Sequence, residues 1–303
     1  MAGNTTTKEP NTQQTEDPRE KGPKPPFHTQ AQPSGGREAE MDPKADHGET
    51  SYQGSGRLKG KVAIVTGGDS GIGRAVAIAY AREGADVVIS YRKQDQDARE
   101  TERWVKDAGR KALLVGGDLG EEKHCQELIA RTVQEFGKLD ILVNNAAQQA
   151  TYSSIEETPS DEFEQTFRTN VFSMFYLCKA AIPRMKPGGA IINTASIQAY
   201  EPTPNLLPYS STKGAIVTFT KGLAKMMGEK GIRVNAVAPG PIWTPLIPAT
   251  MPEEKVKEFG KNTPLGRPGQ PAEVAPVFVF LASQDSSYIL GEIIGVTGGR
   301  VLP

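Results

Sequence analysis

Cysteine, histidine and long apolar runs are all scarce in this chain of 303 residues. The two cysteines, Cys125 and Cys178, stand far apart and lack the CxxC spacing of redox and zinc motifs, so we expect reduced, buried thiols. The three histidines, His28, His47 and His124, are not expected near the site identified below, which excludes a Ser-His-Asp hydrolase and a histidine-ligated zinc ion. The longest apolar runs have the length of a strand, which excludes a membrane-spanning helix.

The chain also lacks an excess of charge of either sign. Lys and Arg total 35 and Asp and Glu total 36, which gives a net charge of -1. A balance this close argues against nucleic acid or an anionic membrane as a partner and leaves a small molecule as the expected one. The first residues form no apolar signal-peptide core, so we expect a cytoplasmic protein. We expect no bound metal.

Residues 1–57 are poor in aliphatic side chains and rich in Pro, Gly, Gln, Thr and charge. Such a composition buries too little apolar area to offset the entropy lost on ordering. We therefore expect a disordered or extended N-terminal arm that solubilises the protein. The alternative is an arm that docks along a partner subunit, with Phe27 of "PPFH" as its anchor.

From residue 58 to 303, short apolar runs alternate with segments of helical periodicity. Expected strands cover 61–68, 85–91, 111–118, 139–147, 189–196, 232–240 and 291–299. Expected helices cover 71–84, 98–109, 123–137, 161–185 and 209–231. Parallel strands need crossover connections, and both sheet faces are then covered by helices. The pattern predicts one α/β domain with a doubly wound, seven-stranded parallel sheet.

A glycine-rich loop, "TGGDSGIG", joins the first expected strand to the first expected helix. Glycines allow a tight turn and close approach of a ligand to the backbone, and the helix N-terminus favours a phosphate. The spacing G-x-x-x-G-x-G departs from the general G-x-G-x-x-G fingerprint, and turns alone also favour glycine. The context between strand and helix predicts a dinucleotide site. Its expected residues are Gly67, Ser70, Gly71, Ile72 and Gly73.

The end of the second strand discriminates between dinucleotides. A carboxylate there would hold a ribose 2′-hydroxyl, whereas this chain has Tyr91, Arg92 and Lys93 and no carboxylate before Asp95. A guanidinium suits a 2′-phosphate, so we predict a preference for NADP(H), with NAD(H) use possible. A solvated basic loop is the alternative interpretation.

Four polar residues in the second half can carry out a hydride-transfer reaction together. Tyr209 and Lys213 lie one helical turn apart, Ser196 ends a strand, and Asn170 interrupts an apolar helix. A lysine ammonium is expected to lower the pKa of the tyrosine, which then acts as general acid and base. The serine would hold the substrate oxygen, and the asparagine would support a proton relay. Tyr-x-x-x-Lys alone is a weak signal, but the four residues beside a phosphate loop are not.

These motifs, with "NNAA", "YSSTK" and "APGPIWT", resemble the short-chain dehydrogenase/reductase family over residues 58–303. The resemblance implies a Rossmann-type fold, a homotetramer or less often a dimer, and an enzyme that interconverts an alcohol and a carbonyl. It also implies cofactor contacts from Tyr209 and Lys213, and further ones from Asp118, Leu119, Asn145, Ala146, Pro239, Gly240, Ile242 and Thr244. Ala147 and Ala195 depart from the common pattern. The long polar arm resembles a subgroup related to glucose/ribitol dehydrogenases and bacterial general-stress oxidoreductases.

A proline-punctuated segment follows the last of these motifs. We expect it to form a lid, with Trp243, Leu246 and Ile247 as apolar walls of the substrate pocket. Packing alone, or an oligomer contact, is the alternative for this segment.

A second function from another class stays open: a stress-protective or regulatory dinucleotide-binding protein with little turnover. The hydrophilic arm motivates it, whereas the complete set of Asn170, Ser196, Tyr209 and Lys213 favours an enzyme.

Overall fold

The computed structural model describes residues 17–33, 35–300 and 302–303. Its centre is one sheet of seven parallel strands in the order β3-β2-β1-β4-β5-β6-β7. The strands are β1 (Val62–Thr66), β2 (Asp86–Tyr91), β3 (Ala112–Gly116), β4 (Ile141–Asn144), β5 (Ala190–Thr194), β6 (Arg233–Pro239) and β7 (Ile293–Val296). The predicted doubly wound Rossmann-type sheet is confirmed.

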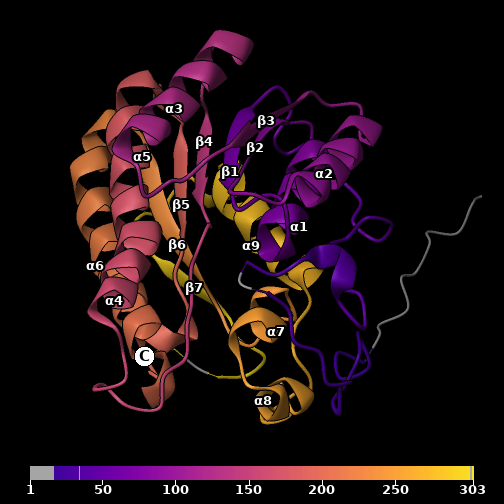
Figure 1. Cartoon of the computed structure of the whole chain (residues 1–303). Helices are drawn as coiled ribbons and strands as arrows, with labels where there is room; N and C mark the ends of the chain where they lie inside the picture. The colour runs from indigo at the N-terminus through magenta and orange to yellow at the C-terminus, as the bar shows by residue number, and fades with distance from the viewer. Residues whose placement is uncertain (1–16, 34, 301) are drawn as a thin grey trace, which may run out of the picture.

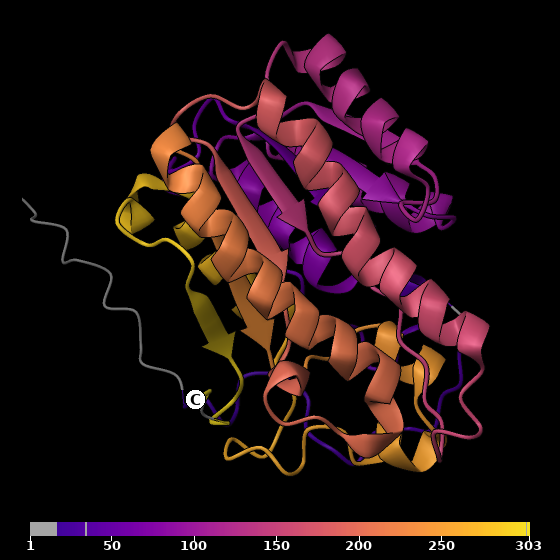
Figure 2. The ribbon, with the colours of Figure 1, turned by 90° about the vertical axis from the view of Figure 1, so that its left-hand side faces the viewer.

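Helices cover both faces of this sheet (Figures 1 and 2). On one face lie α1 (Gly71–Arg82), α2 (Asp95–Asp107) and α9 (Pro271–Ala282), which share a core with β1 and β2. On the other face lie α3 (Glu122–Phe136), α4 (Ser160–Phe167), α5 (Ser173–Ala181) and α6 (Leu207–Met227). The sequence did not predict α9, because its run "PAEVAPVFVFLA" is apolar on nearly every side and shows no helical period.

The strand order places a crevice where the chain reverses direction. β1 pairs with β2 on one side and with β4 on the other, so Ala63 lies opposite both Val87 and Ile141. The chain builds β2 and β3 outward from β1 and then returns to add β4 on the opposite side. In such sheets ligands bind outside the carboxyl ends of the strands at this reversal. Thr66 and Asn144 end the two strands that flank it.

The N-terminal segment is extended and packs on the domain. We call residues 17–33 and 35–57 the N-terminal arm; residues 1–16, for which disorder was also expected, lie outside the described residues. In Figure 1 the arm passes α1 and the two short helices α7 (Leu246–Thr250) and α8 (Glu253–Lys257). Phe27 and Met41 are buried against Ile247 and Val256. Of the two predicted forms, the structure thus shows the extended one.

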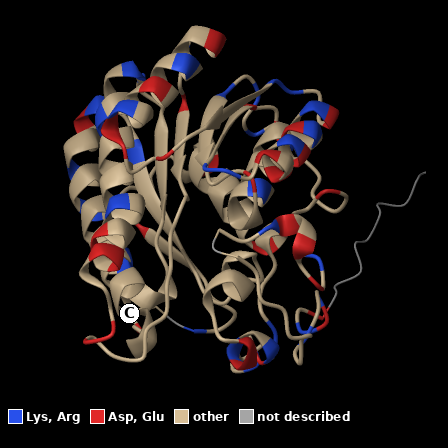
Figure 3. Ribbon diagram, in the orientation of Figure 1, with Lys and Arg blue, Asp and Glu red and all other residues tan. Residues whose placement is uncertain are grey.

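Charged residues of both signs are mixed along the helices that face the viewer in Figure 3. Cys125 and Cys178 are both buried and unpaired, as predicted. In the described part of the chain, no helix is long and apolar enough to cross a membrane. Nor do the described His, Cys, Asp and Glu residues form a cluster of three or more that could hold a metal ion.

Candidate functional site

A cavity of about 620 Å³ opens at the carboxyl ends of the strands. It is continuous from the glycine-rich loop after β1 to the start of α6, so one ligand can reach both. The predicted residues that line it are Gly67, Ser70, Gly71, Ile72, Tyr91, Arg92, Asp118, Leu119, Asn145, Ala146, Ser196, Tyr209, Lys213, Pro239, Gly240, Ile242 and Thr244. Gly73, Asn170 and Trp243 are not among the lining residues.

The glycine-rich loop has the conformation that a phosphate-binding turn needs. Gly67 and Gly71 have φ angles of 62° and 49°, in the left-handed region that favours glycine. A Cβ atom at Gly73 would collide with the carbonyl oxygen of Gly67, so this residue packs the helix against the loop. The amino-terminal end of α1 then faces the cavity with backbone N–H groups not yet bonded within the helix. These residues fit the phosphates of a dinucleotide.

Thr66 ties the two flanking strands together beneath this loop. Its hydroxyl donates to the Val143 carbonyl at 3.1 Å and accepts from the backbone N–H groups of Asn145 and Ala146 at 2.8 and 3.0 Å. The side chain of Asn145 donates to the Thr66 carbonyl at 3.0 Å. These hydrogen bonds connect the end of β1 to the end of β4 and the residues that follow it. The sequence identified Asn145 and Ala146 but missed Thr66, whose partner strand lies about eighty residues away.

Tyr91, Arg92, Asp118 and Leu119 meet at one end of the cavity, at the ends of β2 and β3. The Arg92 Nη2 atom lies 3.0 Å from the Asp118 Oδ2 atom, and both side chains are largely exposed. An exposed pair of this kind is weak, so the guanidinium can exchange its partner for a ligand anion at little cost. Arg92 thus lines the cavity just after the end of β2.

Tyr209 and Lys213 lie on the cavity-facing side of α6, and both are buried. The Lys213 Nζ atom donates to the Thr194 carbonyl at 2.7 Å and lies 5.2 Å from the centroid of the Tyr209 ring. Burial raises the pKa of Tyr209 to about 12, which the Ser196 hydroxyl partly offsets. Burial also lowers the pKa of Lys213 to about 7. The prediction of a lowered tyrosine pKa is wrong for this arrangement, because desolvation outweighs the other effects on Tyr209.

Asn170 lies behind the cavity rather than in it. It belongs to a single π-helical turn, Arg168–Phe172, between α4 and α5. Its Oδ1 atom accepts from the Gln148 N–H at 2.7 Å, and its Nδ2 atom donates to the Gln148 carbonyl at 2.9 Å. Nδ2 also donates to the Thr212 hydroxyl at 3.1 Å. Asn170 therefore fixes the loop after β4 to the helix that carries Tyr209, and π turns of this kind are frequent at functional sites.

The segment after β6 forms α7 and α8, and residues of α7 line the cavity. Leu246 and Ile247 line the cavity, as predicted for apolar walls. Trp243 does not: its side chain is 0% exposed, stacks on Phe27 at a centroid distance of 4.2 Å, and donates from Nε1 to the Pro43 carbonyl at 2.8 Å. The prediction of a pocket wall is corrected for Trp243, which packs beneath the arm.

The structure adds lining residues that the sequence did not indicate. Gln149 and Gln198 flank the reactive end, and Gly35 of the arm reaches the end near Tyr91. The prediction that no histidine lies near the site is wrong for His47, which contacts Glu38 directly behind Gly71. No sequence signal marks these residues, because their positions depend on the course of a polar segment with no periodicity.

Known proteins resemble this chain in sequence and structure. The model of the enoyl-(acyl carrier protein) reductase family matches residues 67–300. General stress protein 39 of Bacillus subtilis (strain 168) is 54% identical over 88% of this chain and 93% of its own length. The glucose and ribitol dehydrogenase homolog of Oryza sativa subsp. japonica is 49% identical over 92% and 97%. A short chain dehydrogenase from Burkholderia cenocepacia J2315, solved in complex with NADP, has a TM-score of 0.75 and 32% identity, and covers 80% of this chain and 98% of its own.

The similarity to these curated proteins extends into the N-terminal segment. The alignments with the two curated proteins leave fewer residues of this chain unmatched than the 57 of the N-terminal segment. Both alignments therefore include part of that segment.

Proposed function

Because the chain belongs to the short-chain dehydrogenase/reductase family, we propose that it is an NADP(H)-preferring oxidoreductase that interconverts an alcohol and a carbonyl, with Tyr209 as general acid and base. The family membership makes it a dehydrogenase or reductase that uses a nicotinamide dinucleotide. The observation that carries the proposal is the continuity of one cavity from Gly71 to Tyr209.

Each polar residue of the site has a distinct role in this proposal. A dinucleotide held in this cavity would supply or accept the hydride. In the reducing direction, the Tyr209 hydroxyl donates its proton to the substrate oxygen, which the Ser196 hydroxyl holds in place. The high pKa of Tyr209 keeps this proton on the phenol until it is needed. Asn170 keeps the loop at Gln148 in position from behind.

Lys213 also has a structural role in this proposal, beyond the roles that its sequence position predicts. Its amino group is bonded to the Thr194 carbonyl at the end of β5, next to Ser196. We propose that this bond anchors the helix of Tyr209 to the strand of Ser196 and presents the remaining N–H groups of Lys213 to the dinucleotide ribose. A positive charge there also favours the phenolate that forms after proton transfer.

Replacing the tyrosine hydroxyl tests this mechanism. Tyr209→Phe should lower kcat by about 10²–10⁴-fold, since that is the usual contribution of a positioned general acid. The readout is NADPH absorbance over a panel of sugars, polyols, short aldehydes, quinones and 3-oxoacyl thioesters. Tyr200→Phe, which changes a tyrosine outside the cavity lining, is the matched control. Turnover of Tyr209→Phe close to that of the wild type on any accepted substrate would refute the assignment.

The preference for NADP(H) rests on Arg92. Its guanidinium lines the cavity beside Tyr91, and the relative solved with NADP supports the choice. Arg92→Ala should raise the Kd for NADPH by about tenfold or more, since a charge-assisted hydrogen bond contributes about 1.5–3 kcal/mol. The Kd for NADH should not change, and Arg103→Ala, an exposed arginine on α2, should alter neither. Equal affinities for both dinucleotides, unaffected by Arg92→Ala, would contradict the preference.

The resemblance to a general stress protein keeps a protective or regulatory function as the second candidate. Tight NADPH binding without turnover across the panel would favour it over the enzyme.

We also propose a cytoplasmic homotetramer. Phe172, Phe175 and Met226 are large apolar side chains exposed on the face made by the π turn, α5 and α6. A second copy of the chain that covers this face would remove them from water.

A further inference from the structure

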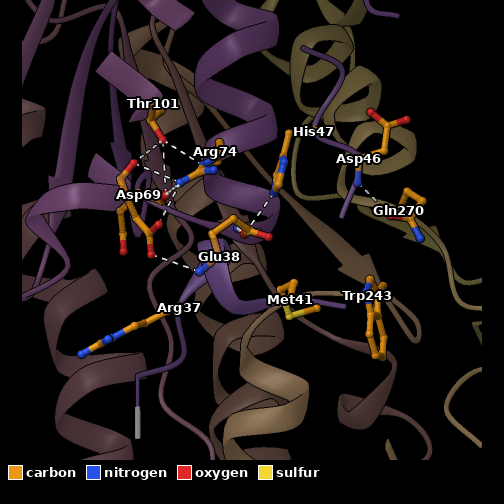
Figure 4. Close-up of polar contacts among 12 residues, drawn as sticks. Arg37, Glu38, Met41, Asp46, His47, Asp69, Arg74, Thr101, Trp243 and Gln270 are labelled. Carbon is orange, nitrogen blue, oxygen red and sulfur yellow. Dashed lines mark hydrogen bonds and ion pairs between the residues drawn. The ribbon is translucent and has the colours of Figure 1, made fainter. Parts of the chain in front are cut away.

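The N-terminal arm places a buried carboxylate and a buried imidazole behind the glycine-rich loop (Figure 4). Glu38 is 4% exposed, and its Oε2 atom accepts from the Gly71 N–H at 2.7 Å. The His47 Nε2 atom lies 3.0 Å from the same oxygen. His47 is 2% exposed, and its other ring nitrogen contacts Glu49 at 2.9 Å. A segment with a polar composition thus contributes a buried ion pair at the start of α1.

Neither residue of the pair lines the cavity, whereas Asp69, Ser70, Gly71 and Ile72 do. Glu38 therefore contacts the loop at Gly71 without forming part of the cavity wall. The backbone of Glu38 is itself held, because its N–H donates to the Asp97 carboxylate of α2 at 3.0 Å. The carboxylate is fixed between two helices and limits how Gly71 can move.

The charges around the pair are mostly negative. The groups that face it are Glu49 from the arm, Asp69 from the loop, Arg74 from α1 and Asp97 from α2. Arg74 Nη2 lies 3.5 Å from the Asp97 carboxylate and donates to the Asp69 carbonyl. Among the described residues, the buried atoms Glu38 Oε1 and His47 Nε2 have no hydrogen-bond partner, so the 3.0 Å contact of the pair is an ion-pair contact. His47 is therefore the principal cation in contact with Glu38.

The protonation states agree with this geometry. Burial lowers the pKa of His47, but the neighbouring Glu38 and Glu49 outweigh it, so the pKa lies above the ordinary value. Burial raises the pKa of Glu38, but His47, Arg74 and the Gly71 N–H outweigh it. Both shifts favour the ionised forms of the two side chains.

We propose that Glu38 and His47 are a positioning pair for the dinucleotide: Glu38 holds the phosphate-binding end of α1, and His47 cancels the charge that would otherwise repel the phosphates. A negative charge near a helix N-terminus competes with a bound anion, unless a cation beside it balances that charge. The arm is then a part of the cofactor site. This inference rests on dinucleotide binding at the α1 loop and is independent of the substrate and of Tyr209.

The pair is tested with the full-length chain by calorimetric titration of NADPH and of adenosine, which has no phosphate. His47→Gln leaves Glu38 without its cation and should raise the Kd for NADPH about tenfold. Glu38→Gln/His47→Gln removes both charges and should return the Kd to within about threefold of the wild type. The Kd for adenosine should stay constant in both variants. Glu40→Gln, an exposed carboxylate in the same turn, is the matched control.

The outcomes separate this inference from the proposed function. An unchanged Kd for NADPH in His47→Gln would contradict the proposal that Glu38 and His47 act as a positioning pair. An equal loss in the single and double variants, or a parallel loss for adenosine, would also overturn it, because a packing defect and not a charge would then be the cause. In turnover assays of His47→Gln, KM for NADPH should rise while kcat stays the same. A wild-type chain that binds no dinucleotide would overturn the cofactor site itself and this inference with it.

Discussion

The domain and the N-terminal arm both bury aromatic rings, but they hold them in different ways. Phe278 of α9 lies in a core that spans β1, β2, α1 and α9, so apolar side chains surround it. Phe27 of the arm lies in a small cluster with Trp243 and Met41. Backbone hydrogen bonds supplement this cluster, such as that from the Phe27 N–H to the carbonyl of Lys257 in α8 at 2.9 Å. The domain is held by continuous burial, and the arm by separate anchors.

Buried cations differ between the two regions in the same way. Lys213 in the domain is bonded to a backbone carbonyl, whereas His47 in the arm contacts two carboxylates. Burial lowers the pKa of Lys213 to about 7. The carboxylates raise the pKa of His47 above its ordinary value despite burial. The charge of Lys213 in the domain is therefore destabilised by burial, whereas the charge of His47 in the arm is stabilised by the carboxylates of Glu38 and Glu49.

The largest effect is expected for the aromatic ring of the domain. Phe278→Ala leaves a cavity that the rigid sheet cannot fill, so the free energy of unfolding should fall by about 3–5 kcal/mol. Urea denaturation followed by circular dichroism measures this change. Tyr288→Ala, which removes a ring that is 101% exposed, should change stability by less than about 0.5 kcal/mol. A loss below about 1 kcal/mol for Phe278→Ala would contradict the assignment of α9 to a continuous core.

The next effect is a pH dependence that has opposite signs in the two regions. The Lys213 pKa is lowered in the folded state, so its contribution to stability is present above pH 10.5 and is lost as the pH falls through about 7. The His47 pKa is raised, so its contribution is present below pH 6.5 and is lost as the pH rises through its folded value. Lys213→Met and His47→Gln should therefore remove slopes of opposite sign.

For Lys213 the bond to the Thr194 carbonyl favours the ammonium and reduces the effect of burial. Relative to Lys213→Met, the wild type should lose about 4 kcal/mol of stability between pH 10.5 and pH 7, because the pKa of Lys213 is lowered from 10.5 to about 7 on folding. Urea titrations at several pH values give this difference. A difference that does not vary with pH, or that grows toward low pH, would show that Lys213 is not desolvated as described.

The sequence predicted the sheet and the glycine-rich loop because each strand is one local run of apolar residues and the loop stands between a strand and a helix. It also predicted that Ser196, Tyr209 and Lys213 come together, because the carboxyl ends of parallel strands share one edge. Their electrostatics could not be predicted, since burial depends on the surrounding packing. Tyr209 has a raised pKa, and not the lowered one that a nearby lysine alone would give.

The contacts of the N-terminal arm, by contrast, could not be predicted from the sequence. Its polar composition indicated a segment without a core, and this holds for most of its side chains. Glu38 is nevertheless bonded to Gly71, 33 residues away, and Trp243 is covered by Phe27. Such contacts come from single residues at large sequence separations, and neither periodicity nor spacing marks them. The error for Trp243 has the same origin: its neighbours in sequence line the cavity, while its own ring faces the arm.

The smallest effect is expected for the aromatic ring of the arm. Phe27→Ala removes the stack on Trp243 and should let the arm open locally, while the domain unfolds with nearly unchanged stability, because the arm and the sheet share little core. Trypsin should cut after Arg37 and Lys44 about tenfold faster than in the wild type, and the urea transition should shift by less than about 1 kcal/mol. His28→Ala changes the exposed neighbour and should leave the cleavage rate as it is. A loss of global stability as large as that of Phe278→Ala would mean that the arm belongs to the cooperative core, and the distinction between the two regions would fail.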